Sequence, residues 1–118
     1  MQPDSSQYLF DIRQAIERIQ TFIVGVDFAA YRADEQLKSA VERQLITIGE
    51  AISQFSRVDS DRARRLTEHS RIIGMRNILV HAYGDVDDTL VWAAVTTRLT
   101  VLHNEAGRLL EDDDRGHT

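Results

Sequence analysis

Hydrophobic residues recur every three or four positions along most of the chain, which is the spacing of one face of an α-helix. The first stripe spans residues 8–26, and the Asp-Ser-Ser sequence at 4–6 offers N-cap oxygens in front of it. A second stripe spans residues 37–55 and begins just after Asp34, which can also cap a helix. The pattern predicts two long amphipathic helices that are joined by a short link and pack antiparallel.

Two further helices are expected in the middle of the chain. Asp59 and the serine after it can cap a short, arginine-rich helix that reaches about residue 68. Ser70 can cap the next helix, whose apolar positions continue to Val80 and which Gly84 is placed to end.

A last stripe spans residues 90–110, behind acidic capping residues at 85–88. The single proline stands at position 3, and no segment alternates with the period of two that a half-buried strand shows. We therefore expect an all-α, antiparallel bundle of four main helices plus one short helix. Residues 1–118 would form one domain, with the acidic tail at 112–118 disordered.

The composition narrows the class of protein. The chain has no cysteine, so disulfides and thiolate chemistry are excluded. No apolar run approaches the roughly 20 residues of a membrane span, and the N-terminus lacks the basic start and apolar stretch of a signal peptide. His69, His81, His103 and His117 show no metal-ligand spacing. We expect a cytoplasmic protein with no membrane contact, no metal and no cofactor.

The net charge of −5 argues against strong nonspecific binding to nucleic acid, but the charges are unevenly distributed. Arginines gather between positions 57 and 76, whereas residues 111–114 are acidic. The planar fork of arginine suits phosphates. This cluster is either a solvated helix face or a set of contacts to an RNA backbone, for which the candidates are Arg62, Arg64, Arg65 and Arg71.

The segment from Arg76 to Tyr83 contains the candidate chemistry. Arg76 stays charged, and His81 can accept or donate a proton near neutral pH, so together they can cleave a phosphodiester. Asn77 lies four residues before His81 on the predicted helix, where it can orient the imidazole or contact a phosphate. A capping histidine and a salt-bridged arginine would explain the same residues without any catalysis.

Cleavage by an RNA 2′-hydroxyl needs a base, an acid and positive charge at the phosphorus. One histidine does not easily act as both base and acid. A twofold homodimer would bring a second His81 and a second Arg76 into the same cleft, so we expect a homodimer.

Three separated motifs resemble one known family. They are the Arg76-Asn77-x3-His81-x-Tyr83 motif with the segment 72–75 before it, the segments 40–45 and 48–51, and the segments 86–87 and 90–92. In this order they resemble the HEPN domain, and within it the HepT-like ribonuclease toxins, over residues 8–110. Where that family usually has Pro-Trp, this chain has Glu68-His69, a departure at a position that is more structural than chemical.

The resemblance implies a dimeric helical bundle that cleaves RNA without metal and serves as the toxin of a toxin–antitoxin system. It implies catalytic roles for Arg76 and His81, and substrate-orienting roles for Asn77 and Tyr83. It also implies a partner, a minimal nucleotidyltransferase antitoxin of the MntA type, which transfers AMP to the motif tyrosine, here Tyr83. The alternative is a noncatalytic, nucleotide-binding interaction subunit that partners such a nucleotidyltransferase.

Gly49 and Glu50 lie in the middle of the second predicted helix. A glycine there costs about 1 kcal/mol relative to alanine, which suggests a close backbone contact. Glu50 is placed to reach across the bundle and hold the guanidinium of Arg76, with a plain surface glutamate as the alternative.

Overall fold

The computed structural model describes residues 5–81 and 86–116, and every regular element in those ranges is a helix. This confirms the all-α prediction. The two helices of the first half are α1 (Ser5–Phe22) and α3 (Glu35–Val58), with a short α2 (Phe28–Ala33) between them. A short α4 (Ser60–Ala63) and the longer α5 (His69–His81) follow. The last helical stretch comprises α6 (Asp88–Ala93), the π-helical segment η1 (Ala94–Arg98) and α7 (Leu99–Gly116).

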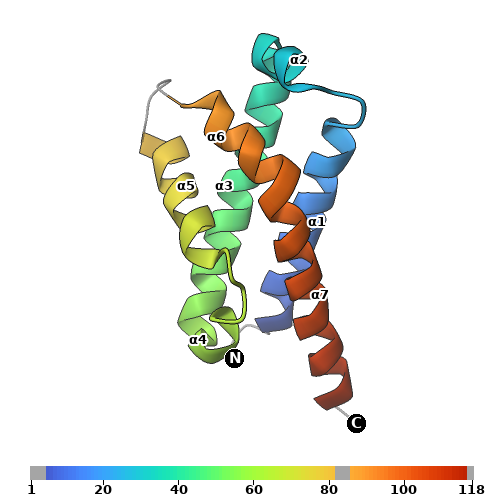
Figure 1. The fold of residues 1–118 in the computed structure, drawn as a ribbon. Helices are drawn as coiled ribbons and strands as arrows, with labels where there is room; N and C mark the ends of the chain where they lie inside the picture. The colour runs from blue at the N-terminus through green and yellow to red at the C-terminus, as the bar shows by residue number, and fades with distance from the viewer. Residues whose placement is uncertain (1–4, 82–85, 117–118) are drawn as a thin grey trace.

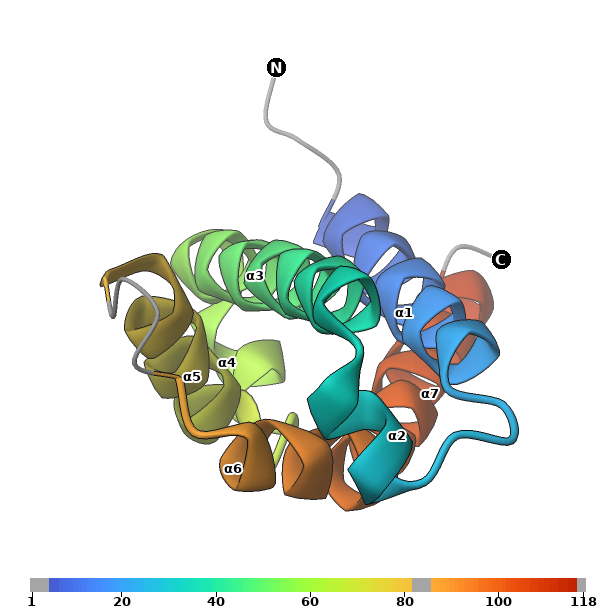
Figure 2. The same cartoon turned by 90° about the horizontal axis from the view of Figure 1, so that it is seen from above.

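The long helices run alternately up and down the bundle (Figure 1). Helix α3 packs against α1 on one side and α5 on the other, and α1 also packs against α7 (Figure 2). This order places the helix with Arg76 and His81 directly beside the helix with Gly49 and Glu50.

Capping side chains define the link between α1 and α3. Asp34 caps α3 as predicted, because its Oδ1 accepts a hydrogen bond of 3.0 Å from the backbone N–H of Leu37. Helix α1 ends at Phe22, before Gly25, whose φ of 73° lies in the left-handed region that favours glycine. Asp27 then caps α2, which the hydrophobic pattern did not predict.

Tyr31 explains why α2 forms. Its side chain is fully buried, and its ring lies 5.0 Å from the ring of Trp92 on α6, centroid to centroid. The link between α1 and α3 therefore packs against α6 instead of crossing the end of the bundle as an open loop. The contact between the rings of Tyr31 and Trp92 holds α2 against α6.

The last stretch differs from the single uninterrupted helix that its stripe predicted. One π-helical turn, η1, separates α6 from α7, and the Thr96 hydroxyl there donates to the Trp92 carbonyl at 2.7 Å. Helix α7 continues to Gly116 rather than fraying at residue 112. Positions 117 and 118 lie outside the described residues.

Pairing with arginines holds the acidic end of α7. Asp112 lies 3.0 Å from Arg65, and Asp113 lies 2.6 Å from Arg62. The sequence pattern did not connect the arginine cluster with the acidic end, because no local signal links residues that are about fifty positions apart.

Aliphatic side chains from α1, α3 and α7 fill most of the core. Its larger, fully buried members are Leu9, Ile12, Ile16, Ile19, Tyr31, Leu45, Ile48, Ile52, Phe55, Leu66, Ile72, Leu99 and Leu102. Helix α5 contributes only Ile72 to this buried set, although its sequence is rich in apolar residues.

Candidate functional site

The close contact between α3 and α5 determines where Arg76 sits. Gly49 is buried in α3, and a β-carbon added to it would lie 2.7 Å from the Cγ of Arg76 and 3.4 Å from the carbonyl oxygen of Ile72. A side chain at position 49 therefore cannot coexist with this placement of Arg76. The backbone contact that the sequence suggested for the mid-helix glycine is present, and its partner is the motif arginine.

Two polar side chains hold the guanidinium of Arg76. Its Nη2 lies 3.5 Å from Oε1 of Glu50, and its Nη1 donates a hydrogen bond of 2.7 Å to Oδ1 of Asn77. The ion pair expected between Glu50 and Arg76 is thus present. The Nε of Arg76 is buried and has no hydrogen-bond partner among the described residues. Arg76 is therefore held in position, and its buried Nε–H donor is still unused.

His81 is the last residue of α5, and its side chain is exposed. It lies five residues after Arg76, which on a helix is about 140° around the axis and roughly 7.5 Å along it. No described residue hydrogen-bonds to its ring, and Asn77 contacts Arg76 rather than His81. The expectation that Asn77 orients the imidazole is not matched by this geometry. Tyr83 lies outside the described residues.

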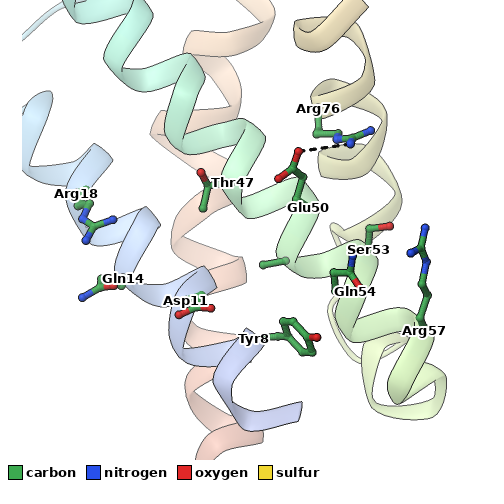
Figure 3. Close-up of a pocket in the computed structure, with 11 residues that line it drawn as sticks. Tyr8, Asp11, Gln14, Arg18, Thr47, Glu50, Ser53, Gln54, Arg57 and Arg76 are labelled. Carbon is green, nitrogen blue, oxygen red and sulfur yellow. Dashed lines mark ion pairs between the residues drawn. The ribbon is translucent and has the colours of Figure 1, made fainter. Parts of the chain in front are cut away.

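A pocket of about 570 Å³ opens beside Arg76, over the groove between α1 and α3 (Figure 3). Arg76 and Glu50 line it, whereas His81 does not. Tyr8 and Arg18 of α1 also line it, although the sequence pattern did not single them out. Tyr8 belongs to a stripe that predicts core, and Arg18 is an ordinary charged residue on the polar face of a helix, so neither carried a local signal.

The four arginines proposed as RNA contacts are not equally available. Arg62 pairs with Asp59 and Asp113, donates to the Leu109 carbonyl at 3.3 Å and lies over the ring of Phe55. An RNA phosphate would have to compete with these partners, so Arg62 is held as part of the fold.

The other three arginines are freer. Arg65 pairs with Asp112 at 3.0 Å on the surface, and Arg64 lies 3.8 Å from Asp61 with both side chains largely exposed. Arg71 is exposed and pairs with no carboxylate in the described ranges. Surface ion pairs of this kind are weak and are easily exchanged.

Exposed apolar side chains surround the end of α5. Ile78 on α5 and Leu90 on α6 are 53% and 58% exposed and line the same apolar hollow of about 200 Å³. Val80, the neighbour of His81, is 39% exposed. Large apolar groups exposed together mark surfaces that contact other molecules more often than isolated ones do.

Residues 5–81 and 86–116 contain no cluster of three or more His, Asp or Glu side chains arranged to bind a metal ion. Within those ranges, no helix combines the length and the apolar character needed to cross a bilayer.

The fold and the motif together describe an all-helical bundle with an arginine–histidine pair on one exposed helix. A family model described as "Ribonuclease HepT-like" matches residues 12–109 of this chain. The match covers the helix that carries Arg76 and His81. It also covers Gly49 and Glu50, which contact Arg76. The chain belongs to the HepT-like ribonuclease family.

Individual relatives agree with this assignment. The chain is 31% identical over 109 residues to a "Probable ribonuclease HepT" of Thermococcus cleftensis, an alignment that covers 92% of this chain and 98% of the relative. A candidate RNase of Methanocaldococcus jannaschii is 29% identical over 92 residues, which is 78% of this chain and 84% of the relative. Another from the same organism is 26% identical, with 92% and 93% covered. No solved structure matches the chain.

Proposed function

We propose that this protein is the toxin of a toxin–antitoxin system and cleaves RNA by attack of a 2′-hydroxyl on the adjacent phosphodiester. One observation carries the proposal. In a chain of the HepT-like ribonuclease family, Gly49, Glu50 and Asn77 fix the guanidinium of Arg76 on the same helix that exposes His81. A fixed cation and a free imidazole are the groups that this reaction needs.

In the proposed reaction, His81 exchanges protons and Arg76 stabilises charge. A base removes the 2′-hydroxyl proton, the resulting oxygen attacks phosphorus, and the 5′-oxygen of the next nucleotide leaves with a proton from an acid. The products are a 2′,3′-cyclic phosphate and a 5′-hydroxyl. The guanidinium of Arg76 would contact the phosphoryl oxygens, whose negative charge rises in the transition state. The two proton transfers require no metal ion.

The active form in this proposal is a homodimer. One chain offers one exposed motif histidine, so a second copy would supply the group that completes the acid–base pair. The exposed apolar residues Ile78, Val80 and Leu90 flank the His81 end of α5 and offer a surface that a second copy would cover. Their continuity with the motif favours another copy of this chain over an unrelated partner.

The proposed antitoxin is a minimal nucleotidyltransferase of the MntA type that attaches AMP to Tyr83. An AMP group on this residue would add bulk and a negative phosphate two residues from His81. Incubation with that partner and ATP should add AMP-sized mass to the wild type and none to Tyr83→Phe. An unchanged wild-type mass, or increments on another residue, would remove Tyr83 from this role.

Two experiments test the function itself. Purified protein should cleave RNA in EDTA and leave cyclic-phosphate or 3′-phosphate ends. Production of the protein without its partner should arrest growth, and His81→Ala should relieve the arrest. A protein that binds nucleotide but cleaves no RNA and arrests nothing would instead be the noncatalytic subunit of a nucleotidyltransferase.

A further inference from the structure

The pocket beside Arg76 has the properties of a binding site in its own right. Its volume of about 570 Å³ falls within the range of small-molecule sites in proteins. Helix α3 runs along its base, with Thr47 and Gln54 among the lining residues, and α1 forms one wall. Figure 3 shows Arg18 on the α1 side of the pocket, and Arg57 and Arg76 on the opposite side.

The charges of this pocket leave two cations without a partner. Glu50 pairs with Arg76, and Asp11 accepts a hydrogen bond of 2.9 Å from the Gln7 side chain. Arg18 and Arg57 are exposed, and neither pairs with any carboxylate in the described part of the chain. By contrast, Arg62 and Arg65 form ion pairs with Asp113 and Asp112 at the C-terminal end of α7. The lining therefore has three arginines against the two carboxylates of Asp11 and Glu50, an excess of one positive charge, although the chain as a whole is acidic.

The neutral lining residues suit a nucleotide rather than a bare anion. Ser53, Gln54 and Gln14 offer hydroxyl and amide groups that both donate and accept hydrogen bonds. Tyr8 is half-buried, and its ring offers an apolar face on which a base can stack. The guanidinium groups of Arg18 and Arg57 lie on opposite sides of the pocket, and the planar fork of each matches the geometry of phosphate oxygens.

We infer that this pocket binds a phosphodiester of the single-stranded RNA next to the one that is cleaved, with Arg18 and Arg57 contacting phosphate oxygens and Tyr8 stacking on a base. The inference rests on the proposed ribonuclease function. Arg76 links the two sites, because it lines this pocket and also lies on α5 about 7.5 Å along the helix from His81. A strand held in the pocket would therefore be led past Arg76 toward His81.

Binding can be measured without cleavage, in a His81→Ala background. The probe is a fluorescent single-stranded RNA of about ten nucleotides, and AMP and ATP are tested separately. Arg18→Gln and Arg57→Gln should each raise the RNA Kd about three- to tenfold. Each should also lower the salt dependence of log K by about 0.7, which is the loss of one phosphate contact in a single strand. Arg57→Lys, which keeps the charge but not the fork, should lie in between.

Arg32→Gln is the matched control, because Arg32 is an exposed arginine on α2 outside this pocket. It should change the RNA Kd less than twofold, by a rough estimate for one distant surface charge. The inference is overturned if Arg18→Gln and Arg57→Gln bind RNA with the same Kd as the protein in which both arginines are intact. It is also overturned if Arg32→Gln weakens binding equally, or if ATP or AMP binds more tightly than RNA in an arginine-dependent way.

A cleavage assay on the same variants, made with His81 intact, separates this inference from the proposed function. Cleavage with no effect of the pocket arginines on binding would refute only the pocket. Arginine-dependent RNA binding by a protein that never cleaves would refute only the ribonuclease.

Discussion

Gly49 lies against the side chain of Arg76 so closely that a β-carbon at position 49 would come within 2.7 Å of the arginine Cγ. Gly49 is buried in α3, and the side chain of Arg76 on α5 packs against it. The residue after the glycine, Glu50, then meets the guanidinium at 3.5 Å. One dipeptide on α3 thus provides both the space for Arg76 and the charge that holds it.

Gly49→Ala should reduce cleavage strongly. Overpacking of a close contact costs about 1–3 kcal/mol, of which the higher helix propensity of alanine returns up to about 1 kcal/mol. The variant should therefore fold but displace Arg76, and a misplaced catalytic group lowers the rate by about a hundredfold. Cleavage rate and thermal unfolding are the measurements.

Gly74→Ala is the matched control for Gly49→Ala. Gly74 lies on the same helix as Arg76, but a β-carbon there would meet nothing within 4 Å beyond its chain neighbours and the backbone of its own helix. This variant should be as stable as the wild type or up to about 1 kcal/mol more stable, with unchanged cleavage. Equal loss of activity in both variants would mean that the Gly49 contact has no special role.

The sequence predicted which residues form the candidate site, but it predicted their contacts less well. A glycine in the middle of a long amphipathic helix indicates a close approach, and the Gly49–Arg76 contact confirms that reasoning. Spacing on one helix paired Asn77 with His81, yet Asn77 turns to its immediate neighbour Arg76. The choice between two partners within reach depends on how α5 is rotated against α3, and a single helix does not specify that rotation.

Glu50→Gln should slow turnover with little effect on stability. The variant removes the charge that opposes Arg76 but keeps the size of the side chain. The pair is partly exposed, so the free energy of unfolding should change by about 0.5 kcal/mol or less. We expect kcat to fall about tenfold while KM changes little, because the guanidinium acts mainly in the transition state.

Glu17→Gln is the control for the charge change at Glu50. Glu17 pairs with His103 at 2.7 Å and has a side-chain exposure of 57%, close to the 56% of Glu50. It lies away from the motif, so cleavage should be unaffected. If both variants lose the same activity, loss of the Arg76 partner is not the cause.

Assembly is tested at the exposed apolar residues beside the motif. Ile78→Asp or Leu90→Asp should shift the protein from dimer to monomer in sedimentation and abolish cleavage, because a buried unpaired carboxylate opposes association. Val101→Asp places the same charge on α7, at a valine that is 45% exposed, and should leave both properties intact. A fully active monomer at assay concentration would refute the shared cleft.

The buried phenol of Tyr31 should make the free energy of unfolding depend on pH in the alkaline range. Burial raises the pKa of Tyr31 well above its ordinary value near 10, and the nearby Glu42 and Asp88 raise it further. The folded state therefore favours the protonated phenol. Its contribution to stability is complete below pH of about 10 and is lost as pH rises from there toward the folded pKa, by up to about 1.4 kcal/mol per pH unit.

Tyr31→Phe should flatten that alkaline loss. The hydroxyl is buried and no described group hydrogen-bonds to it, so at about pH 8 the variant should equal the wild type or gain about 1 kcal/mol. Denaturant unfolding at about pH 8 and pH 11 measures both effects. An identical pH dependence in the two proteins would contradict the assigned cause.

Periodicity predicted the long helices because each carries an apolar stripe that must be buried, as in α1 and α3. It missed α2, a single short helix whose stability comes from Tyr31 against Trp92. It also missed the helical order of the acidic end of α7, where Asp113 meets Arg62. In both cases the partners are distant in sequence and local patterns contain no trace of them.

The most direct test of the proposed function is cleavage of RNA by the purified protein in EDTA. Wild type should cleave, His81→Ala should not, and the circular dichroism melting curves of the two should agree, because His81 is exposed at the end of α5. His103→Ala removes a histidine on α7 that pairs with Glu17 and should retain full activity. Undiminished cleavage by His81→Ala, or cleavage that appears only with added Mg²⁺, would contradict the mechanism.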